Sequence, residues 1–523
     1  MLVISGALTA LTLVVPDLGF IEWLSLIPAA IALISYSQDR EIKYKKLYRK
    51  GMLFFISYYL VIYHWFLYMY PLDFAGISKM AAVGVVLFAW LGLSLFQALG
   101  SALIFVLFAF IFRLEILKRV SWVLPIFAAA IWTSFEWIQT IGWWGVPWGR
   151  LCLGQSNVTL FLRSSAVLGS YFLTFVIVAV NFSFACLIVF KESKKQLVSA
   201  AAILFCLNIV LGLTVTLSYK DEGDTVRFGA VQGNISTSEK WGGDTVNRSW
   251  EVHYKLTREA ALNGADVIVW SETVLPYNFF ENQTLVDYMS DLARTASSTI
   301  LFSTFTEGNG ADYSDSHYDG LYNSIVEVKS DGSYGENIYF KQRLVPFGEF
   351  VPMRSLITKI IPPLAELDVL GEDLLFGKDA VIIESEVGRI GCGICFDSIY
   401  EQLMREAVLS GAQILVISTN DAWFSDSAAL EMHNSQARLR AIETGRYLVR
   451  SANTGISSII DPLGREMTRL GALEDGIIYD DVYMRDNITP YTYIGNLFVY
   501  VCIAAVIGIV FSELVFYKRK NTF

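Results

Sequence analysis

Long apolar runs lie on both sides of a central block of mixed sequence in this chain. Residues 219–492 carry charges throughout, whereas eight stretches outside that block are almost free of charge. These stretches are 2–16, 20–36, 51–70, 81–112, 120–138, 165–190, 197–218 and 493–517. A helix needs about 20 apolar residues to cross a bilayer, so the pattern predicts a bundle of about eight spans. The first stretch is short, and the fourth is long enough to contain a bend.

Segments typical of strands and of helices alternate within the central block. The expected strands are 226–235, 265–272, 299–306, 412–419, strands within 447–460, and 476–483. The expected helices are 244–262, 281–296, 398–409 and 429–445. Hairpins are expected around Asp331-Gly332 and Val387-Gly388. This alternation predicts an α/β layered sandwich. We therefore expect a membrane domain at 1–218, a globular domain at 219–492, and a last span with a basic tail at 493–523.

Composition supports a membrane protein and suggests its orientation. The chain is 54% hydrophobic and 17% charged, with mean hydropathy +0.46, which is too apolar for an ordinary soluble surface. Of the 18 basic residues outside 219–492, 15 lie in 40–50, 113–119, 191–195 and 518–520. Basic loops stay in the cytoplasm, so alternating spans would place the globular domain outside it.

The net charge of the globular domain excludes one class of partner. Residues 219–492 hold 22 Lys and Arg against 41 Asp and Glu. A domain this acidic is not expected to bind nucleic acid through its phosphates. It is equally unsuited to binding a membrane surface through a polybasic patch.

Two cysteines three residues apart in GCGICFD have the spacing of a redox pair or half a zinc site. If this segment is a strand, Cys392 and Cys395 lie about 10 Å apart at about 3.3 Å per residue. A disulfide needs Cα atoms within about 4.4–6.8 Å. The sequence has no second CxxC, and its histidines are scattered, so a zinc site is not expected. We predict that Cys392 is a small buried residue and that Cys395 is reactive.

Three chemically useful side chains follow expected strands. Glu272 ends ADVIVWSE, Lys341 ends NIYFK, and Cys395 ends GRIGCGIC. Sites in α/β folds gather at strand ends. A thiol, a carboxylate and an ammonium together can attack a carbonyl, move its proton and stabilise the charge that develops. A thiol at the start of a helix near a lysine is predicted to have a lowered pKa. Any one of these residues alone is more often structural.

The sequences around these residues resemble the nitrilase, or carbon–nitrogen hydrolase, superfamily, and most closely its membrane-embedded apolipoprotein N-acyltransferase family. The matching stretches are VQGNI (231–235), KW (240–241), VIVWSET (267–273), YFKQRLVPFGEFVP (339–352), GICFD (393–397), TNDAWF (419–424), ARLRAIETGR (437–446) and RSANTGISSIID (450–461). The most specific is VPFGEFVP. The resemblance covers the whole chain, because the family has about seven spans before this domain and one after. It implies a nitrilase-like αββα sandwich.

The resemblance also implies roles for individual residues. By that match, Glu272 is the general base, Lys341 stabilises the oxyanion and Cys395 is the nucleophile. The residues matching supporting or substrate-side positions are Trp241, Glu349, Phe396 and Asp397. At the last two positions relatives usually have Tyr-Glu, so a hydroxyl is missing here and the carboxylate is one carbon shorter.

The activity implied by the resemblance is acyl transfer between two lipid-anchored substrates. A glycerophospholipid, typically phosphatidylethanolamine, would acylate Cys395. The thioester would then acylate the α-amino group of the N-terminal S-diacylglyceryl-cysteine of an apolipoprotein. No metal or cofactor is needed, and a monomer in the bacterial inner membrane with a periplasmic catalytic domain is expected. The alternatives are a membrane-anchored extracytoplasmic amidase and a non-catalytic lipoprotein-binding protein.

One acidic residue within the apolar runs allows two interpretations. Glu136 lies near the end of the fifth run, next to a tryptophan-rich loop. An ionisable residue inside a membrane is a functional candidate. At the end of a span, beside an aromatic belt, it is more often interfacial.

Overall fold

The computed structural model describes residues 1–72, 77–114, 117, 121–142, 144–190, 193–240, 245–307, 320–360 and 373–521. Two compact units make up the chain. The first, called the helical unit here, comprises Met1–Leu67, Val83–Tyr219 and Ile494–Phe523. The second, the sandwich unit, comprises Tyr68–Ala82 and Lys220–Tyr493.

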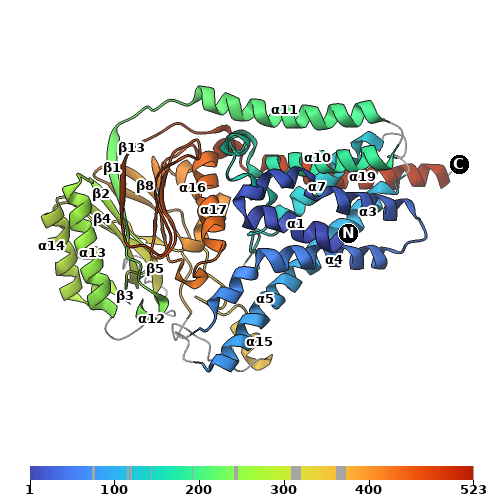
Figure 1. The fold of residues 1–523 in the computed structure, drawn as a ribbon. Coiled ribbons are helices and arrows are strands. Elements are labelled where there is room, and N and C mark those ends of the chain that lie inside the picture. Colours follow the sequence, from blue (N-terminus) through green and yellow to red (C-terminus); the bar gives the residue numbers. More distant parts are fainter. Residues whose placement is uncertain are drawn as a thin grey trace. The chain divides into compact units, whose positions relative to one another are not determined.

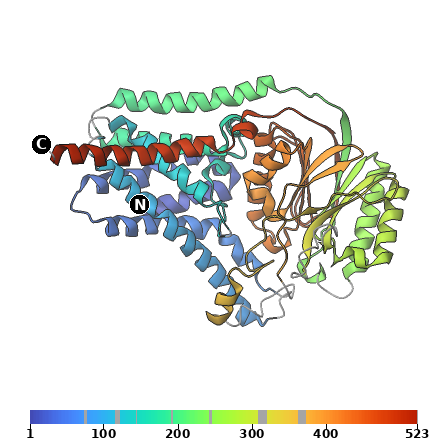
Figure 2. The same cartoon turned by 180° about the vertical axis from the view of Figure 1, so that it is seen from behind.

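All eight apolar stretches contain helices (Figures 1 and 2). The longer helices are α1 (Leu2–Val14), α3 (Ile27–Gln38), α4 (Tyr44–Ile62), α5 (Lys79–Ser101), α6 (Leu103–Phe112), α7 (Leu124–Ile138), α10 (Ser170–Val189), α11 (Lys194–Ser218) and α19 (Leu497–Asn521). The fourth stretch is divided at Ala102 into α5 and α6. Among the described residues, five helical segments are long and apolar enough to cross a membrane, so the count of eight spans stays a prediction.

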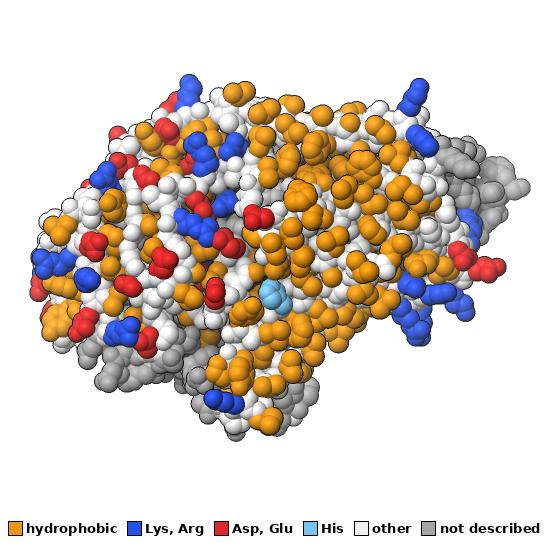
Figure 3. All heavy atoms as spheres, in the orientation of Figure 1, with side chains coloured by type: hydrophobic (Ala, Val, Ile, Leu, Met, Phe, Trp, Pro, Cys, Tyr) orange, Lys and Arg blue, Asp and Glu red, His pale blue; other side chains and the backbone are white. Residues whose placement is uncertain are grey.

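The surface of the helical unit is apolar, as a lipid-facing surface requires. Hydrophobic side chains cover much of its face in Figure 3. Helix α11 is only 11% buried over its most apolar window, and α5 exposes large side chains such as Phe88 and Phe96. An exposed apolar area of this kind marks an interaction with lipid or another apolar partner.

Glu136 lies inside the helical unit. Its side chain is 4% exposed, and its Oε1 accepts hydrogen bonds from the Trp132 indole and the Leu151 amide, both at 3.0 Å. Its Oε2 accepts from the Thr174 hydroxyl at 2.8 Å. These donors on α7, α10 and the segment between them enclose the carboxylate, and its depth in a membrane stays a prediction.

The sandwich unit contains two sheets. The first has the order β13-β1-β2-β4-β5-β6, with β3 also paired to β4, and the second has the order β12-β11-β10-β9-β8-β7. The strands of the first sheet are β1 (Thr225–Gln232), β2 (Val267–Trp270), β3 (Leu275–Asn278), β4 (Thr299–Thr306), β5 (Tyr322–Val328), β6 (Tyr339–Phe340) and β13 (Gly476–Tyr483). Those of the second are β7 (Ile382–Ser385), β8 (Gly388–Ile394), β9 (Ile414–Thr419), β10 (Leu448–Ala452), β11 (Ser457–Ile460) and β12 (Glu466–Leu470).

Helices cover the outer face of each sheet. Helices α13 (Thr245–Leu262) and α14 (Gln283–Ala296) pack on the first sheet, and α16 (Glu401–Leu409) and α17 (Ala429–Thr444) pack on the second. Figures 1 and 2 show the four layers in the order helix, sheet, sheet, helix. The αββα sandwich is thus confirmed. Its placement outside the cytoplasm stays a prediction.

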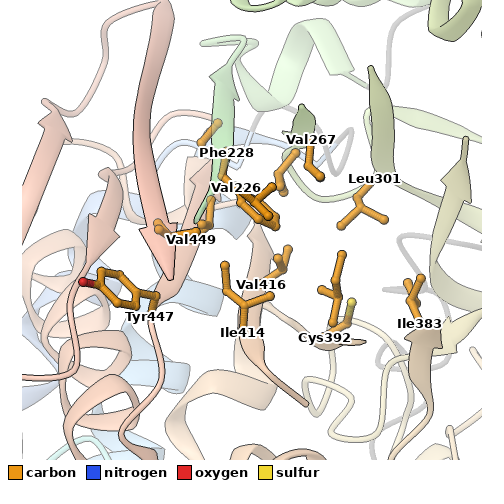
Figure 4. Packing of buried hydrophobic residues seen from close by; sticks show 14 of the residues in the cluster. Val226, Phe228, Val267, Leu301, Ile383, Cys392, Ile414, Val416, Tyr447 and Val449 are labelled. Atoms are coloured by element: carbon orange, nitrogen blue, oxygen red, sulfur yellow. The ribbon is translucent and has the colours of Figure 1, made fainter. Parts of the chain in front are cut away.

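The core between the two sheets contains the first cysteine of GCGICFD. Side chains such as Phe228 and Leu301 from one sheet meet Ile414 and Val416 from the other (Figure 4). Cys392 on β8 is 2% exposed and points into this core. It is a small buried residue, as predicted, and both cysteines of the motif are free thiols.

Candidate active site

Side chains from the ends of strands in both sheets come together in the sandwich unit. Glu272 lies two residues after β2, and Lys341 directly follows β6 in the same sheet. Lys341 Nζ is 2.9 Å from Glu272 Oε1. Cys395 directly follows β8 in the second sheet and interacts electrostatically with both residues. The three predicted residues therefore form one cluster.

The Glu272 carboxylate is charged and held by donors on both oxygens. Its Oε1 accepts from Lys341 and from Asn323 Nδ2 at 2.8 Å, and its Oε2 accepts from the Asn420 amide at 2.9 Å. Burial opposes ionisation, but the positive charges of Lys341 and Lys240 lower the pKa of Glu272 below its usual range. The result is an oriented carboxylate that is ready to accept a proton.

Lys341 lies between two carboxylates. Its Nζ is 2.9 Å from Oε1 of both Glu272 and Glu349, and its side chain is 1% exposed. Burial disfavours the ammonium, but the two carboxylates raise the pKa of Lys341 well above its usual range. Glu349 Oε2 accepts from the Val345 amide at 2.8 Å, which fixes the PFGE turn. Glu349 thus lies beside the cluster, where the resemblance places it.

Cys395 has an uncommon backbone conformation at the junction of strand and helix. It is the first residue of a 3-10 helix (Cys395–Ile399), and its φ is 48°. A residue other than glycine costs about 1–3 kcal/mol in this left-handed region and persists where neighbours fix it. The chain turns sharply here, so the thiol leaves the line of the strand.

The predicted lowering of the Cys395 pKa is wrong for the substrate-free protein. Burial raises the pKa of the thiol above its usual range, the Glu272 carboxylate raises it further, and Lys341 opposes these effects only in part. The helix that begins at Cys395 has only five residues, too few for a strong dipole. The thiol is therefore protonated at rest and has to lose its proton to a base during attack.

This electrostatic balance predicts the effect of Glu272→Gln on thiol chemistry. Removing the carboxylate that raises the pKa of Cys395 should lower that pKa, so alkylation by iodoacetamide should proceed at lower pH. Acyl transfer should nevertheless be lost, because no base remains. The measurement is the alkylation rate of the Cys395 peptide by mass spectrometry across pH 6–10 (about the range in which thiols titrate).

Glu384→Gln provides a matched control for this prediction, because Glu384 is an exposed carboxylate on β7. It should leave the alkylation profile unchanged. Slower alkylation of Glu272→Gln at every pH would contradict this electrostatic account. It would mean that Glu272 affects the thiol mainly by accepting its proton.

Asp397 joins the segments that carry Lys341 and Cys395. Its Oδ2 accepts from the Tyr339 hydroxyl at 2.9 Å and from the Ile394 amide at 3.0 Å, and its Oδ1 accepts from the Arg343 amide at 2.8 Å. Burial raises the pKa of Asp397 to about 6. Through these contacts, the Asp397 carboxylate holds together the segments that carry Lys341 and Cys395.

Of the other two residues that match the family, Phe396 is described by the structure and Trp241 is not. Phe396 is 9% exposed, and its ring lies 5.4 Å from that of Tyr400, nearly edge-on. Its position is thus fixed by packing. Trp241 lies outside the described residues, so its role near the substrate stays a prediction.

Several residues of the site had no predicted role. Asn323 is the second residue of β5, and nothing in the sequence distinguishes it. Asn420 belongs to TNDAWF, and Lys240 to the KW pair, so both lie in motifs that could have drawn attention. Lys240 is 6% exposed and donates to the Glu272 backbone carbonyl at 2.8 Å, and burial lowers its pKa to about 8.

A histidine that is distant in sequence also reaches the nucleophile. Ligand atoms of Cys395, Asp421 and His433 lie within 4.8 Å of one another, so the scattered histidines include one at the site. This set has the composition of a metal site. However, Asp421 binds the Arg450 guanidinium at 2.6 Å, which would repel a cation, and it also binds the imidazole. The residues fit a hydrogen-bonded network better than a metal centre.

Comparison with known proteins identifies both parts of the chain. A family model described as the apolipoprotein N-acyltransferase N-terminal domain matches residues 5–183, and one described as carbon-nitrogen hydrolase matches residues 227–487. The apolipoprotein N-acyltransferase of Gloeobacter violaceus is 28% identical over 502 residues, which cover 94% of this chain and 90% of that protein. That of Geobacter metallireducens is 27% identical over 530 residues, with 100% and 95% covered.

Among solved structures, an amidase from Nesterenkonia sp. matches 51% of this chain and 93% of its own, with 15% identity and a TM-score of 0.38. The two family models together match both parts of the chain, and the two relatives cover nearly all of it. The chain therefore belongs to the apolipoprotein N-acyltransferase family.

Proposed function

We propose that this protein transfers a fatty acyl chain from a glycerophospholipid to the α-amino group of the N-terminal S-diacylglyceryl-cysteine of apolipoproteins. The observation that carries the proposal is the Glu272–Lys341–Glu349 cluster beside Cys395, in a chain whose sequence has apolar helices before and after this unit. Phosphatidylethanolamine is the proposed donor. The proposed domains are 1–218, 219–492 and 493–523, and the proposed state is a monomer.

In the first step, Cys395 Sγ attacks the ester carbonyl of the donor. Glu272 accepts the thiol proton, and the Lys341 ammonium stabilises the negative charge on the carbonyl oxygen. The bond to the glycerol oxygen then breaks, and Glu272 returns the proton to that oxygen. The products are a lysophospholipid and a Cys395 thioester.

Glu349 has a specific part in this step. When Glu272 becomes neutral, it no longer balances the charge of Lys341. Glu349 Oε1 still lies 2.9 Å from Nζ, so the ammonium keeps a carboxylate partner. Lys341 can therefore remain charged while the oxyanion forms.

In the second step, the α-amino group of the apolipoprotein attacks the thioester. An α-amino group has a pKa of about 7.7–8.0, so about a tenth of it is neutral near pH 7. Glu272 accepts the proton released on attack, the bond to sulfur breaks, and the thiolate of Cys395 regains that proton. The thioester has to meet the amine before water, so the acyl group needs surroundings that exclude water.

We further propose that the catalytic unit lies on the periplasmic side of a bacterial inner membrane. The support is the gathering of 15 of 18 basic residues outside 219–492 in alternate loops. Both substrates are lipid anchored, so attachment to the membrane raises their effective concentration at the site.

The test is intact-mass spectrometry of the purified protein after incubation with phosphatidylethanolamine and no acceptor. We expect one fatty-acyl adduct that hydroxylamine removes. A diacylglyceryl lipopeptide with a free α-amino group should discharge it, and the N-acetylated peptide should not. An unmodified protein with unconsumed lipid, even with the lipopeptide present, would refute the acyltransferase and favour the amidase or the binding protein.

A further inference from the structure

A buried histidine contacts the backbone of the nucleophile. His433 on α17 is 1% exposed, and its Nε2 lies 3.2 Å from the Cys395 carbonyl oxygen and 3.0 Å from Ser398 Oγ. The Ser398 hydroxyl donates to the same carbonyl at 2.7 Å. The imidazole and the hydroxyl therefore converge on one oxygen of the residue that carries the reactive thiol.

The imidazole is itself held in one orientation. Nδ1 lies 2.9 Å from Asp421 Oδ1 and 3.2 Å from the Arg450 guanidinium. A proton on Nε2 lets the ring donate to the Cys395 carbonyl. Burial opposes ionisation of Asp421, but Arg450 and His433 lower its pKa below its usual range.

Asp421 is fixed by several neighbours. Its Oδ2 accepts from Arg450 at 2.6 Å, and its Oδ1 accepts from the Thr419 hydroxyl at 3.0 Å. A Cβ on Gly455 would lie 2.1 Å from Asp421 Oδ2, so the backbone also packs directly on the carboxylate. Residues on β9, α17, β10 and the loops next to them thus build a rigid support beneath Cys395.

We propose that His433 is a positioning residue for the nucleophile, holding Cys395 through its carbonyl in the left-handed conformation that presents Sγ to Glu272 and Lys341. This role contributes to catalysis only if the proposed thioester reaction takes place. It does not require His433 to touch the substrate or to accept the thiol proton. Glu272 keeps that task.

Two substitutions distinguish the contact made by Nε2 of His433 from the contact made by Nδ1. The amide of His433→Gln can reach the position of Nε2 and donate to the Cys395 carbonyl. The shorter amide of His433→Asn can keep only the contact with Asp421. A purely structural role would make the two variants similar, whereas a positioning role predicts rescue by glutamine.

His253 provides a matched control. It is another buried histidine of the same unit, 1% exposed, with Nδ1 2.8 Å from the Ser249 carbonyl and its ring against Trp270. His253→Asn should lower the melting temperature without changing the rate of thioester formation per folded molecule.

The experiment uses the full chain in detergent with phosphatidylethanolamine and no acceptor. It measures the single-turnover rate constant of thioester formation, the donor concentration at half-maximal rate, and the melting temperature. A displacement of about 1 Å at a reacting atom costs about 10²-fold. We expect His433→Asn to form the thioester about tenfold to a hundredfold more slowly. The donor concentration at half-maximal rate should not change. His433→Gln should retain most of the rate.

A second measurement separates failure of this inference from failure of the proposed function. The alkylation rate of Cys395 by iodoacetamide requires no lipid, and it should fall in His433→Asn and recover in His433→Gln. If the wild-type protein forms no thioester, the proposed function fails, and the alkylation rates alone decide the role of His433. Wild-type rates in His433→Asn would overturn the inference. Equal losses in both His433 variants, in proportion to their melting temperatures as in His253→Asn, would do the same.

Discussion

Cys395→Ala is expected to form no acyl adduct and to lose acyl transfer, by about 10⁴-fold or more as when the nucleophile of a triad is removed. Cys392→Ala should keep both. The two thiols are three residues apart, but Cys392 lies in the core between the sheets, 2% exposed. Burial raises the pKa of Cys392 far above its usual range, so this thiol is neither ionised nor accessible to lipid.

The comparison between the two cysteines also controls for stability. Cys392→Ala removes a buried sulfur from a packed core, so it should lower the melting temperature more than Cys395→Ala does. Cys395→Ala should thus lose more activity, and Cys392→Ala should lose more stability. An adduct that persists in Cys395→Ala and disappears in Cys392→Ala would mean that the wrong thiol has been assigned.

Lys341→Met is expected to reduce both acyl transfer and stability. Loss of one hydrogen-bond donor to the oxyanion costs about 10²–10³-fold in rate. The substitution also leaves Glu272 and Glu349 buried without their cation, and breaking a buried ion pair from one side costs about 3–5 kcal/mol. Among the described residues, Asn323 would still bridge the two carboxylates, but an amide cannot neutralise them.

The stability loss should depend on pH in a defined direction. In the wild-type protein the pKa of Glu272 is below its ordinary value of 4.5, so the carboxylate contributes stability above that value and loses it as pH falls. Without Lys341, burial should raise that pKa above 4.5. The destabilisation of Lys341→Met should therefore be largest near pH 7 and shrink towards pH 4 as the carboxyl groups become protonated.

Melting temperatures of the two proteins between pH 4 and 8 measure this effect. Arg227→Met is the matched control, because Arg227 forms a 2.8 Å ion pair with Asp481 on the surface of the same unit. Exposed pairs contribute little, so this variant should melt close to the wild type at every pH. A Lys341→Met protein that melts like the control would contradict a buried, charged cluster.

The sequence alone predicted most of the elements and three candidate residues, Glu272, Lys341 and Cys395. Apolar runs long enough for helices, and alternating strand and helix patterns, are local properties that chain periodicity records. The strand-end positions of Glu272, Lys341 and Cys395, together with motifs such as PFGE, then placed them at one site. Two strands had no such signal: β3 contains a proline and pairs irregularly with β4, and β12 is a short edge strand.

Only the tertiary structure decided the electrostatics and the support of the site. The pKa of Cys395 depends on how deeply the thiol is buried and on which charges lie near it. The prediction of a lowered pKa considered only the start of a helix and a nearby lysine, and it included neither the burial nor the Glu272 carboxylate. The sequence left two interpretations of Glu136 open, and the donors that enclose it come from segments as far away as α10. His433 and Asp421 come to Cys395 from other elements because β8, β9 and β10 are neighbours in one sheet. Such contacts join residues distant in sequence, and local patterns do not record which of them will meet.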